Sequence, residues 1–460
     1  MTNRVESELE NIRMRKNQVW TALALALLAM AGPGMAGPVV EVEEVVATCG
    51  SPDNGAGPYW AYGAPMVVRV GDQVFASVME VGEGVPPLCN TRWRLFRRDE
   101  KGWADVLHPS EFREREPCPI ITTGPGQLLI SVNPSTQPPG TKYGPCDPHL
   151  LAVDLRAPSG EPAKVEPGWP GVPTFTDHSY RGVAADGPRG EALLLNIDAR
   201  TSAVHWAFKD AEEGFTRHGA VEFPIRSCYP QVALRERAAH VLAIGDIVEP
   251  NEAWRAYKSE KTGASWDYVF RRLFYTRNPD VASAEFEPPI EVASVDATGG
   301  HITNLDLWLD EAGNAHLLYL KSTSSPILRD RFFPGEPIVT TLEYATVEND
   351  RIIHHEPLAT GGESRAETPR YGRLHATSDG TLYAVYSIHA RDENGAARLE
   401  NRLLRLTPKR DAEPTRLDLK NPFGMFFTAT ERGGSAPSDT LDLLGPGSGS
   451  EIRHAQIRLR

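Results

Sequence analysis

Histidine, tyrosine and arginine side chains recur along the chain at the start of short apolar segments. His178, Tyr229 and Arg226 carry the clearest chemistry. A neutral imidazole takes a proton near neutral pH, a tyrosine can donate or accept one, and a guanidinium binds a carboxylate through paired hydrogen bonds. We expect Arg226 to lower the pKa of Tyr229 by favouring its phenolate. Together the three side chains could neutralise an anionic substrate and move a proton on it.

Further basic or acidic side chains near these segments are candidates for binding the substrate. They are Arg181, His301, Arg370, Arg373, Arg255 and Asp198. Each also has a structural interpretation, in which it pairs with a loop carboxylate such as Glu114, Glu116 or Glu367, or with a loop carbonyl. Clustered ionisable groups are a marker of function only in a cleft, so the fold decides between the two interpretations.

The elements that must position these side chains form a repeat. Short runs rich in Val, Leu, Ile, Tyr and Phe alternate with Gly, Pro and Asp turns, a pattern typical of an all-β protein. The first strands of the repeat align as Tyr62-x-x-Pro65, Arg115-x-x-Cys118, His178-x-x-Arg181, Arg226-x-x-Tyr229, His301-x-x-Asn304, Arg370-x-x-Arg373 and Asn421-x-x-Gly424. Each register opens a unit of four strands, and this arrangement predicts a seven-bladed β-propeller.

Strands predicted at 39–46 and 452–459 would pair and close the ring, so that residues 37–460 form a single propeller domain. Two β-sandwich domains are the alternative, which the sevenfold register disfavours. The first strand of every blade lines the central channel of a propeller. The basic residues at the first aligned position are therefore expected to converge at one mouth, where an anionic ligand would sit.

The N-terminus has the order of a secretory signal. Arg13, Arg15 and Lys16 precede an apolar run at 19–31, and small residues follow up to Ala36. We expect residues 1–36 to be a cleaved signal peptide, because the run is shorter than the roughly 20 residues that span a bilayer. The mature protein would be secreted or periplasmic, without a membrane anchor.

Export permits disulfides, and Cys49 with Cys89 and Cys118 with Cys146 are the predicted pairs. The formal charge of -13 makes nucleic acid an unfavourable partner. We expect a monomer that requires no cofactor. No segment has the ligand spacing of a metal site, and Ca²⁺ bound by Asp and backbone oxygens is the one structural ion that we consider.

Two segments carry a family resemblance. Ser259-Glu-Lys-Thr-Gly-Ala-Ser-Trp266 resembles the Asp-box turn of sialidase-like, BNR-repeat propellers, with Lys261 in the Asp position. The stretch 178–198 and the pair Tyr229-Pro230 resemble repeats of propeller polysaccharide lyases of the ulvan lyase type. In that family His178 and Tyr229 would match catalytic residues, whereas Asp198 stands where a second His is expected.

The resemblance implies cleavage of an acidic, uronate-containing polysaccharide by β-elimination. Arginine would neutralise the uronate carboxylate, and His178 or Tyr229 would remove the C5 proton and return one to the leaving oxygen. Two alternatives stay open. One is a propeller that binds glycan or protein without catalysis, and the other is a sialidase-like hydrolase, which lacks here the Arg-Ile-Pro signature of that family.

Overall fold

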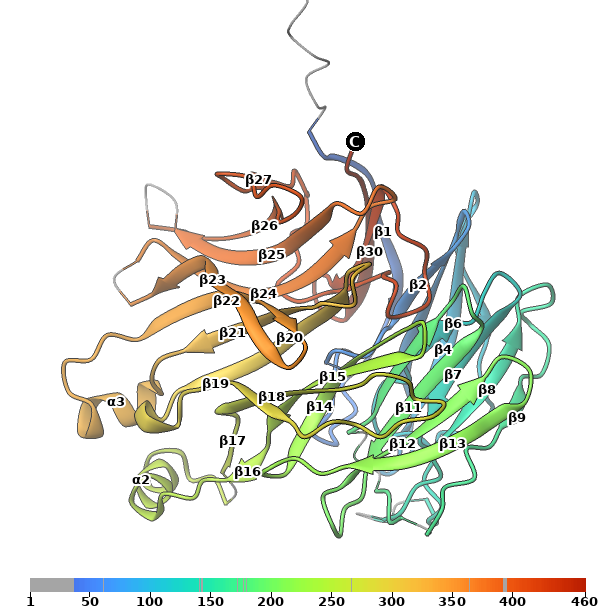
Figure 1. The fold of residues 1–460 in the computed structure, drawn as a ribbon, viewed down its shortest axis with the longest axis horizontal. Coiled ribbons are helices and arrows are strands. Elements are labelled where there is room, and N and C mark those ends of the chain that lie inside the picture. Colours follow the sequence, from blue (N-terminus) through green and yellow to red (C-terminus); the bar gives the residue numbers. More distant parts are fainter. Residues whose placement is uncertain are drawn as a thin grey trace, which may run out of the picture. The chain divides into compact units, whose positions relative to one another are not determined.

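Seven four-stranded antiparallel sheets are arranged as the blades of a β-propeller (Figure 1). The computed structural model describes residues 37–460, except positions 61, 140, 142, 143, 172, 177, 179, 266, 364 and 392–394. The predicted signal peptide, 1–36, lies outside the described residues. Residues Val39–Leu459 form one compact unit. No helix in the described part of the chain is long and apolar enough to cross a membrane.

The first three blades follow one another along the chain, each counted from its inner strand outwards. Blade 1 is β2 (Val67–Val70), β3 (Gln73–Val81), β4 (Thr91–Asp99) and β5 (Gly102–Leu107). Blade 2 is β6 (Ile120–Thr122), β7 (Gln127–Val132), β8 (His149–Asp154) and β9 (Ala163–Val165). Blade 3 is β10 (Gly182–Asp186), β11 (Glu191–Ile197), β12 (Val204–Asp210) and β13 (Gly214–Val221).

The next three blades have the same order. Blade 4 is β14 (Ser227–Arg235), β15 (Ala238–Gly245), β18 (Arg272–Asn278) and β19 (Ile290–Ser294). Blade 5 is β20 (His301–Leu309), β21 (Ala315–Ser322), β22 (Val339–Glu348) and β23 (Arg351–Gly362). Blade 6 is β24 (Glu367–Ala376), β25 (Leu382–Arg391), β26 (Ala397–Arg405) and β27 (Thr415–Arg416).

Blade 7 joins the two ends of the chain. It is β28 (Phe427–Thr428), β29 (Thr440–Pro446), β30 (Glu451–Arg458) and β1 (Val39–Thr48). The outermost strand, β1, pairs antiparallel with β30 from Val39 opposite Arg458 to Thr48 opposite Glu451. The prediction of a seven-bladed propeller closed by its terminal strands is therefore confirmed. Through this pairing blade 7 has four strands like the other blades, with strands from both ends of the chain.

The apolar runs of the second strands are explained by burial on both faces. In β11, Leu193 and Leu195 pack in a cluster with blade 4, whereas Leu194 packs with Ile121 and Leu129 of blade 2. A strand between two blades has no polar face, so its sequence reads as a continuous apolar run. Each such leucine contributes about 1.5–3 kcal/mol through burial.

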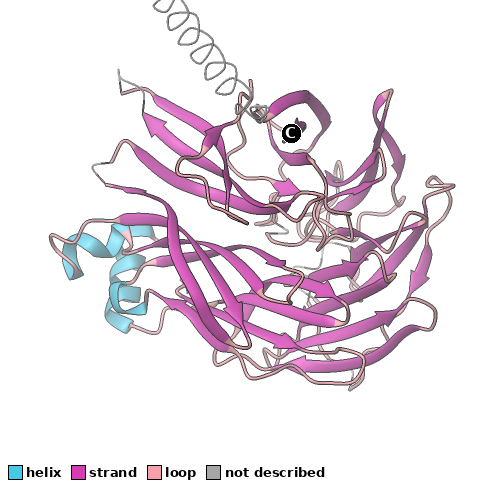
Figure 2. Cartoon of the chain, turned by 45° about the horizontal axis from the view of Figure 1, so that its top comes forward, coloured by secondary structure: helices cyan, strands magenta, loops and turns pink. Residues whose placement is uncertain are grey.

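Two helices extend the connections between second and third strands in neighbouring blades. They are α2 (Glu252–Thr262) in blade 4 and α3 (Pro326–Phe332) in blade 5, and Figure 2 shows them side by side. The short strands β16 (Ile247–Val248) and β17 (Tyr268–Val269) flank α2, and a 3-10 turn at Asp296–Thr298 precedes β20. The segment that resembles an Asp box thus begins inside α2. Its residues 259–262 are therefore helical, whereas the resemblance implies a turn.

The connection that carries α2 is held by buried charges. Arg271 donates from Nη1 and Nη2 to the two carboxylate oxygens of Glu249, at 2.9 and 2.5 Å, and Lys258 of the helix lies 2.8 Å from the same carboxylate. Glu249 and Arg271 are both buried. A bidentate pair with a third partner in this position fixes α2 to the blade.

The predicted disulfides do not form. Each of the five cysteines is a thiol in the structure, and all five lie among the described residues. Cys118 is buried with its Sγ 3.7 Å from Nη2 of Arg181, and Cys146 donates to the carbonyl of Thr176 at 2.8 Å. Loops that are neighbours in sequence therefore do not bring the cysteines together in pairs.

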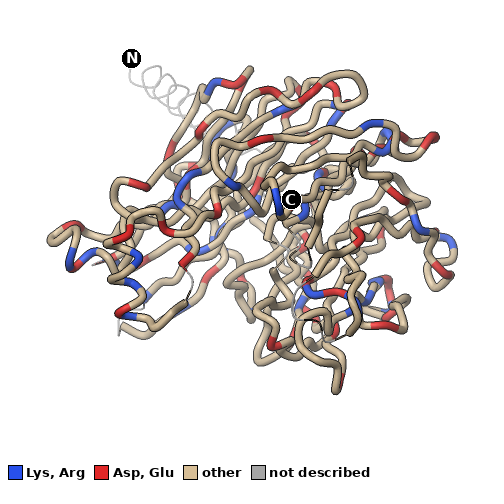
Figure 3. Tube along the Cα trace, turned by 90° about the horizontal axis from the view of Figure 1, so that it is seen from below, with Lys and Arg blue, Asp and Glu red and all other residues tan. Residues whose placement is uncertain are grey.

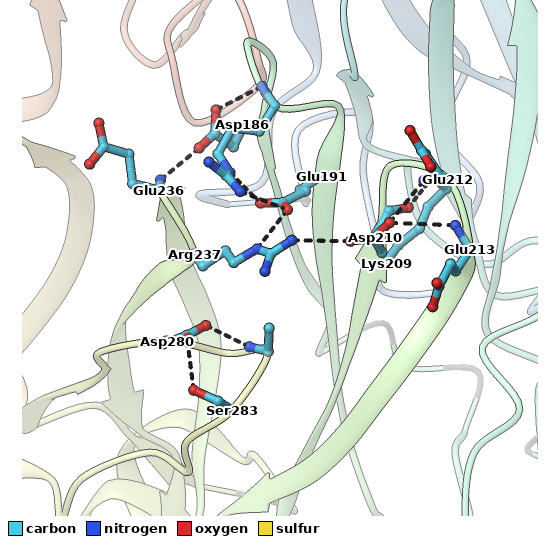
Figure 4. A network of polar contacts seen from close by, with 12 residues as sticks. Asp186, Glu191, Lys209, Asp210, Glu212, Glu213, Glu236, Arg237, Asp280 and Ser283 are labelled. Carbon is cyan, nitrogen blue, oxygen red and sulfur yellow. Dashed lines mark hydrogen bonds and ion pairs between the residues drawn. The ribbon is translucent and has the colours of Figure 1, made fainter.

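Blades 3 and 4 are tied together where their inner strands end (Figure 4). The amide of Glu236 donates to Asp186 at 2.6 Å, while Arg237 donates to Glu191 at 2.8 Å and to Asp210 at 3.2 Å. Glu236 and Arg237 form the two-residue turn between β14 and β15 and have φ values of 51° and 69°. Such a left-handed turn matches the twist of a hairpin and aims both residues at blade 3.

Candidate functional site

The aligned residues of the repeat lie where the inner strands begin, and we call this side of the propeller the start face. Arg226 directly precedes β14, and His301 is the first residue of β20. Antiparallel pairing brings the ends of second strands and the beginnings of third strands to the same face. Helices α2 and α3 therefore also lie on the start face. Acidic and basic residues are interspersed along the trace (Figure 3), so local groups decide the chemistry here.

His178 forms a pair with a buried carboxylate. Its Nδ1 lies 3.1 Å from Oε1 of Glu116, which stands in the connection from blade 1 to blade 2. The histidine side chain is 31% exposed and the glutamate 1%. A carboxylate only accepts hydrogen bonds, so this contact places the proton on Nδ1 and leaves the lone pair of Nε2 for another partner. The arrangement is that of an oriented general base.

Tyr180 and Arg226 continue the site from His178. The rings of His178 and Tyr180 stack with centroids 5.1 Å apart, and the guanidinium of Arg226 lies 4.7 Å above the Tyr180 ring. Arg226 is oriented by Asp246, at 2.7 Å. Burial raises the pKa of Tyr180, and the phenol therefore keeps its proton at neutral pH. It can serve as a proton donor.

Tyr229 lies beneath this layer. Its ring packs on Tyr62, Tyr180 and Phe270 with centroid distances of 4.3, 5.3 and 6.1 Å, and the residue is 9% exposed. Its φ of 50° accompanies an irregularity in the pairing of β14 with β15, which turns the side chain into the aromatic cluster. Burial raises its pKa. The expectation that Arg226 lowers this pKa is wrong, because the guanidinium lies on Tyr180 instead.

Two of the predicted substrate-binding arginines lie in the interior. Arg181 is buried and donates to the carbonyls of Ser131 and Pro117 at 2.9 and 2.7 Å. Arg373 is buried too, and donates to the carbonyls of Phe426, Leu305 and Tyr62. These two guanidinium groups thus donate to main-chain oxygens of several blades and hold the ring together at its centre.

Asp198 is likewise part of the framework. It is buried, and its carboxylate accepts hydrogen bonds from the amides of Arg200 at 2.7 Å, Thr201 at 3.1 Å and Thr174 at 3.2 Å. It organises the turn after β11 through these main-chain contacts. Arg255 is exposed on α2, away from the contacts that define the His178 site.

His301 and Arg370 are both exposed on the start face, in different surroundings. The ring of His301 lies 5.7 Å from Phe270, which contacts Tyr229, so His301 extends the aromatic cluster towards blade 5. Arg370 lines a separate cavity of about 580 Å³ in blade 6. The repeat register therefore places the predicted residues on one face without bringing them all into one site.

Several residues of the site were not predicted as such. Glu116 was expected only to neutralise a basic side chain, and Asp246, Tyr62 and Phe270 were not singled out for function. Tyr62 was visible as the first aligned residue of blade 1, and Asp246 as the first charged residue after the second strand of blade 4. Only the ring closure of the fold shows that these residues meet.

A larger cavity opens at the opposite mouth, where the inner strands end. It measures about 760 Å³ and is lined by residues of blades 1 to 4 and 7, among them Arg69, Asp186, Arg235 and Glu431. Arg69 is paired with the buried Asp442 at 2.7 Å. Within the described residues, no group of three His, Cys, Asp or Glu side chains is placed to hold a metal ion.

Comparisons with known proteins show the fold. No family model matches the chain, and no curated protein sequence matches it. An ulvan lyase structure bound to -[GlcA(1-4)Rha3S]- is similar over 89% of this chain and 94% of its own, with a TM-score of 0.52 and 10% identity. A Penicillium chrysogenum α-L-arabinanase structure covers 93% and 99%, with a TM-score of 0.41 and 10% identity. At 10% identity the likeness to the ulvan lyase structure shows the propeller fold alone.

Proposed function

We propose that this chain is an exported enzyme that cleaves an acidic, uronate-containing polysaccharide by β-elimination at the start face. The observation that carries the proposal is the pair of His178 with the buried Glu116, placed beside Tyr180 and Arg226. A base, a neutral phenol and a guanidinium are the groups that this elimination needs. The ulvan lyase shares the fold and supports the same reaction class.

His178 is the base in the proposed reaction. Nε2 takes the proton from C5 of the uronate, and the electron pair of that C–H bond becomes the double bond between C4 and C5. Glu116 holds Nδ1–H and stabilises the imidazolium that forms, because its carboxylate is buried and 3.1 Å away. Glu116 is thus a positioning residue that acts through His178.

Tyr180 is the proton donor. As the bond between C4 and the glycosidic oxygen breaks, the phenol gives its proton to the leaving oxygen, and a proton later passes from His178 back to the phenolate. Its raised pKa keeps the hydroxyl protonated before the reaction, and the guanidinium of Arg226 at 4.7 Å stabilises the phenolate afterwards. Tyr229 was the residue favoured by the sequence, but its 9% exposure makes it the support of Tyr180 in this scheme.

Arg226 neutralises the substrate carboxylate. Removal of the C5 proton places negative charge next to that carboxylate, so a guanidinium bound to it lowers the barrier. Asp246 and Tyr180 fix the orientation of the guanidinium, which has five N–H donors in all. His301, exposed at the edge of the aromatic cluster, is a further contact for the polymer.

Incubation with a panel of uronate polysaccharides tests the proposal. The expected result is shortened polymer with new unsaturated ends that absorb in the ultraviolet, and no product from the His178→Ala variant. Shortened polymer without that absorbance would show that the enzyme is a hydrolase and not a lyase. Binding without any cleavage, unchanged in His178→Ala and Tyr180→Phe, would make the propeller a glycan-binding protein.

A further inference from the structure

A second basic site lies on the start face in blade 6. A cavity of about 580 Å³ is formed by the end of β23, the beginning of β24, the end of β25 and the beginning of β26. Its basic lining residues are Arg365, Arg370, His389, Arg391 and Arg398. The strand pairing explains their proximity, because His389 stands opposite Thr368 of β24 and Leu399 of β26.

A β-bulge directs Arg370 into this cavity. The pairing of β24 with β25 shifts between Pro369 and Tyr371, so Arg370 is the extra residue. Pro369 and Tyr371 are buried, and the Tyr371 hydroxyl reaches inwards to the carbonyl of Tyr62. Arg370 between them is exposed. Bulges near functional sites commonly re-aim one side chain, and here the re-aimed side chain is a cation.

The described carboxylates near the cavity already have basic partners, and one of these partners is the lining residue Arg398. Glu363, which also lines the cavity, binds Arg329 of α3 at 2.7 Å. Glu400 is shared between Arg398 at 2.5 Å and Arg402 at 2.8 Å. Among the described residues no carboxylate forms an ion pair with Arg370 or Arg365. Counted over the described lining residues, basic side chains therefore outnumber acidic ones, which favours an anionic ligand.

His389 adds a neutral hydrogen-bonding group. Partial burial and the charge of Arg370 lower the pKa of His389, and the imidazole is consequently neutral at pH 7. A neutral imidazole can accept from a hydroxyl group while the neighbouring guanidinium binds an oxyanion. The cavity thus combines groups for an acidic sugar, which carries both hydroxyls and a carboxylate.

We infer that this cavity is a distal subsite for a second carboxylate of the polysaccharide, with Arg370 as its main ligand. The inference rests on the proposed function, since it extends the substrate across the start face from blades 3 and 4 to blade 6. An oligosaccharide long enough to reach both sites gains the Arg370 contact, and a short one does not. The subsite therefore makes affinity depend on the chain length of the substrate and does not change the chemistry at His178.

Binding to the intact chain carrying His178→Ala tests the inference without turnover. Calorimetric titrations with short and long oligogalacturonates would compare Arg370 with Arg370→Gln in this background. We expect Arg370→Gln to weaken binding of the long oligomer about tenfold, the loss of one charge-assisted contact, and to leave the short oligomer unaffected. A fully methyl-esterified long oligomer should bind both forms equally.

The matched control is Arg156→Gln, because Arg156 is an 85% exposed arginine of blade 2 that pairs only with Asp154 in the described contacts. Equal affinities for the long oligomer with and without the Arg370→Gln substitution would overturn the inference, and so would an equal loss in Arg156→Gln. If Arg370-dependent binding persists while the enzyme yields no unsaturated product, the subsite stands and the proposed reaction fails. If the enzyme yields unsaturated product at rates that depend neither on Arg370 nor on the chain length of the substrate, the proposed reaction stands and the subsite fails.

Discussion

Nδ1 of His178 lies 3.1 Å from the carboxylate of Glu116, although the two residues come from different blades and are 62 positions apart in sequence. The contact crosses from the connection before β6 to the connection before β10. It fixes the tautomer and direction of the only histidine that stacks on Tyr180 in the described structure. The predictions on activity depend on this pair.

Glu116→Gln should lower the rate of elimination about 10²–10⁴-fold. The amide of glutamine can donate to Nδ1, which would move the proton to Nε2 and remove the lone pair that takes the C5 proton. Initial rates of ultraviolet-absorbing product, with circular dichroism as a check of folding, measure the effect. Glu114→Gln is the matched control, because Glu114 is also buried but contacts Asn133. Equal rates for both variants would show that Glu116 does not position His178 for the reaction.

Tyr180→Phe and Tyr229→Phe should have different effects on the rate of elimination, although each variant keeps its ring and loses only a hydroxyl. We expect Tyr180→Phe to lower the rate about 10²–10⁴-fold through loss of the proton donor, and Tyr229→Phe to leave it near that of the wild type. Single-turnover rates at saturating substrate separate the chemical step from binding. The reverse order of the two variants would return the donor role to Tyr229.

Asp350→Asn should stabilise the fold at neutral pH. Burial and the nearby Glu287 raise the pKa of Asp350 to about 6, above the value of about 3.9 in an unfolded chain. The folded state therefore binds this proton more tightly, and its stability falls as the pH rises from about 4 to about 6. Asn removes the charge and tolerates the φ of 61° at this turn position.

Thermal unfolding at pH 7 and at a pH below 4 measures the difference in stability between Asp350→Asn and the wild type. Tm of Asp350→Asn should exceed that of the wild type at pH 7, and the two should agree at the lower pH. Asp154→Asn is a control of opposite sign, because Arg156 lowers the pKa of Asp154 to about 2. A lower Tm of Asp350→Asn at pH 7 would show that the ion pair of Asp350 with Arg277 stabilises the fold more than burial and Glu287 destabilise it.

The purified chain should contain five thiols and no disulfide. All five should react with a thiol reagent in denaturant without reductant. In the folded protein Cys49 should react slowly, because burial raises its pKa to about 11. An intact mass lower by the hydrogens of one or two disulfides would contradict the structure.

The architecture could be predicted because each blade obeys a local rule. Second strands such as β11 are buried on both faces, so their apolar runs repeat with the blades and can be counted. The terminal strands were also recognisable, and their pairing followed from the need to close the ring. In contrast, α2 was missed although Asn251 and Gly263 cap it at its two ends, because the resemblance to a turn motif took precedence over these capping signals.

The site could be predicted only to the level of a face. His178 and Arg181 share one register, yet His178 is partly exposed whereas Arg181 is buried among carbonyls of blade 2. Spacing does not say which of two residues points to solvent, and bulges at Tyr229 and Arg370 change the alternation locally. Long-range contacts such as that of Glu116 have no local signal at all.

The most direct test is the product of a uronate polysaccharide after incubation with the wild-type chain and with His178→Ala. Mass spectrometry and ultraviolet absorbance would be recorded on the same samples. We expect oligosaccharides that lack one water relative to hydrolysis products, absorb in the ultraviolet, and are absent with His178→Ala. Products that have gained water, or unsaturated products formed equally well without His178, would contradict elimination by His178.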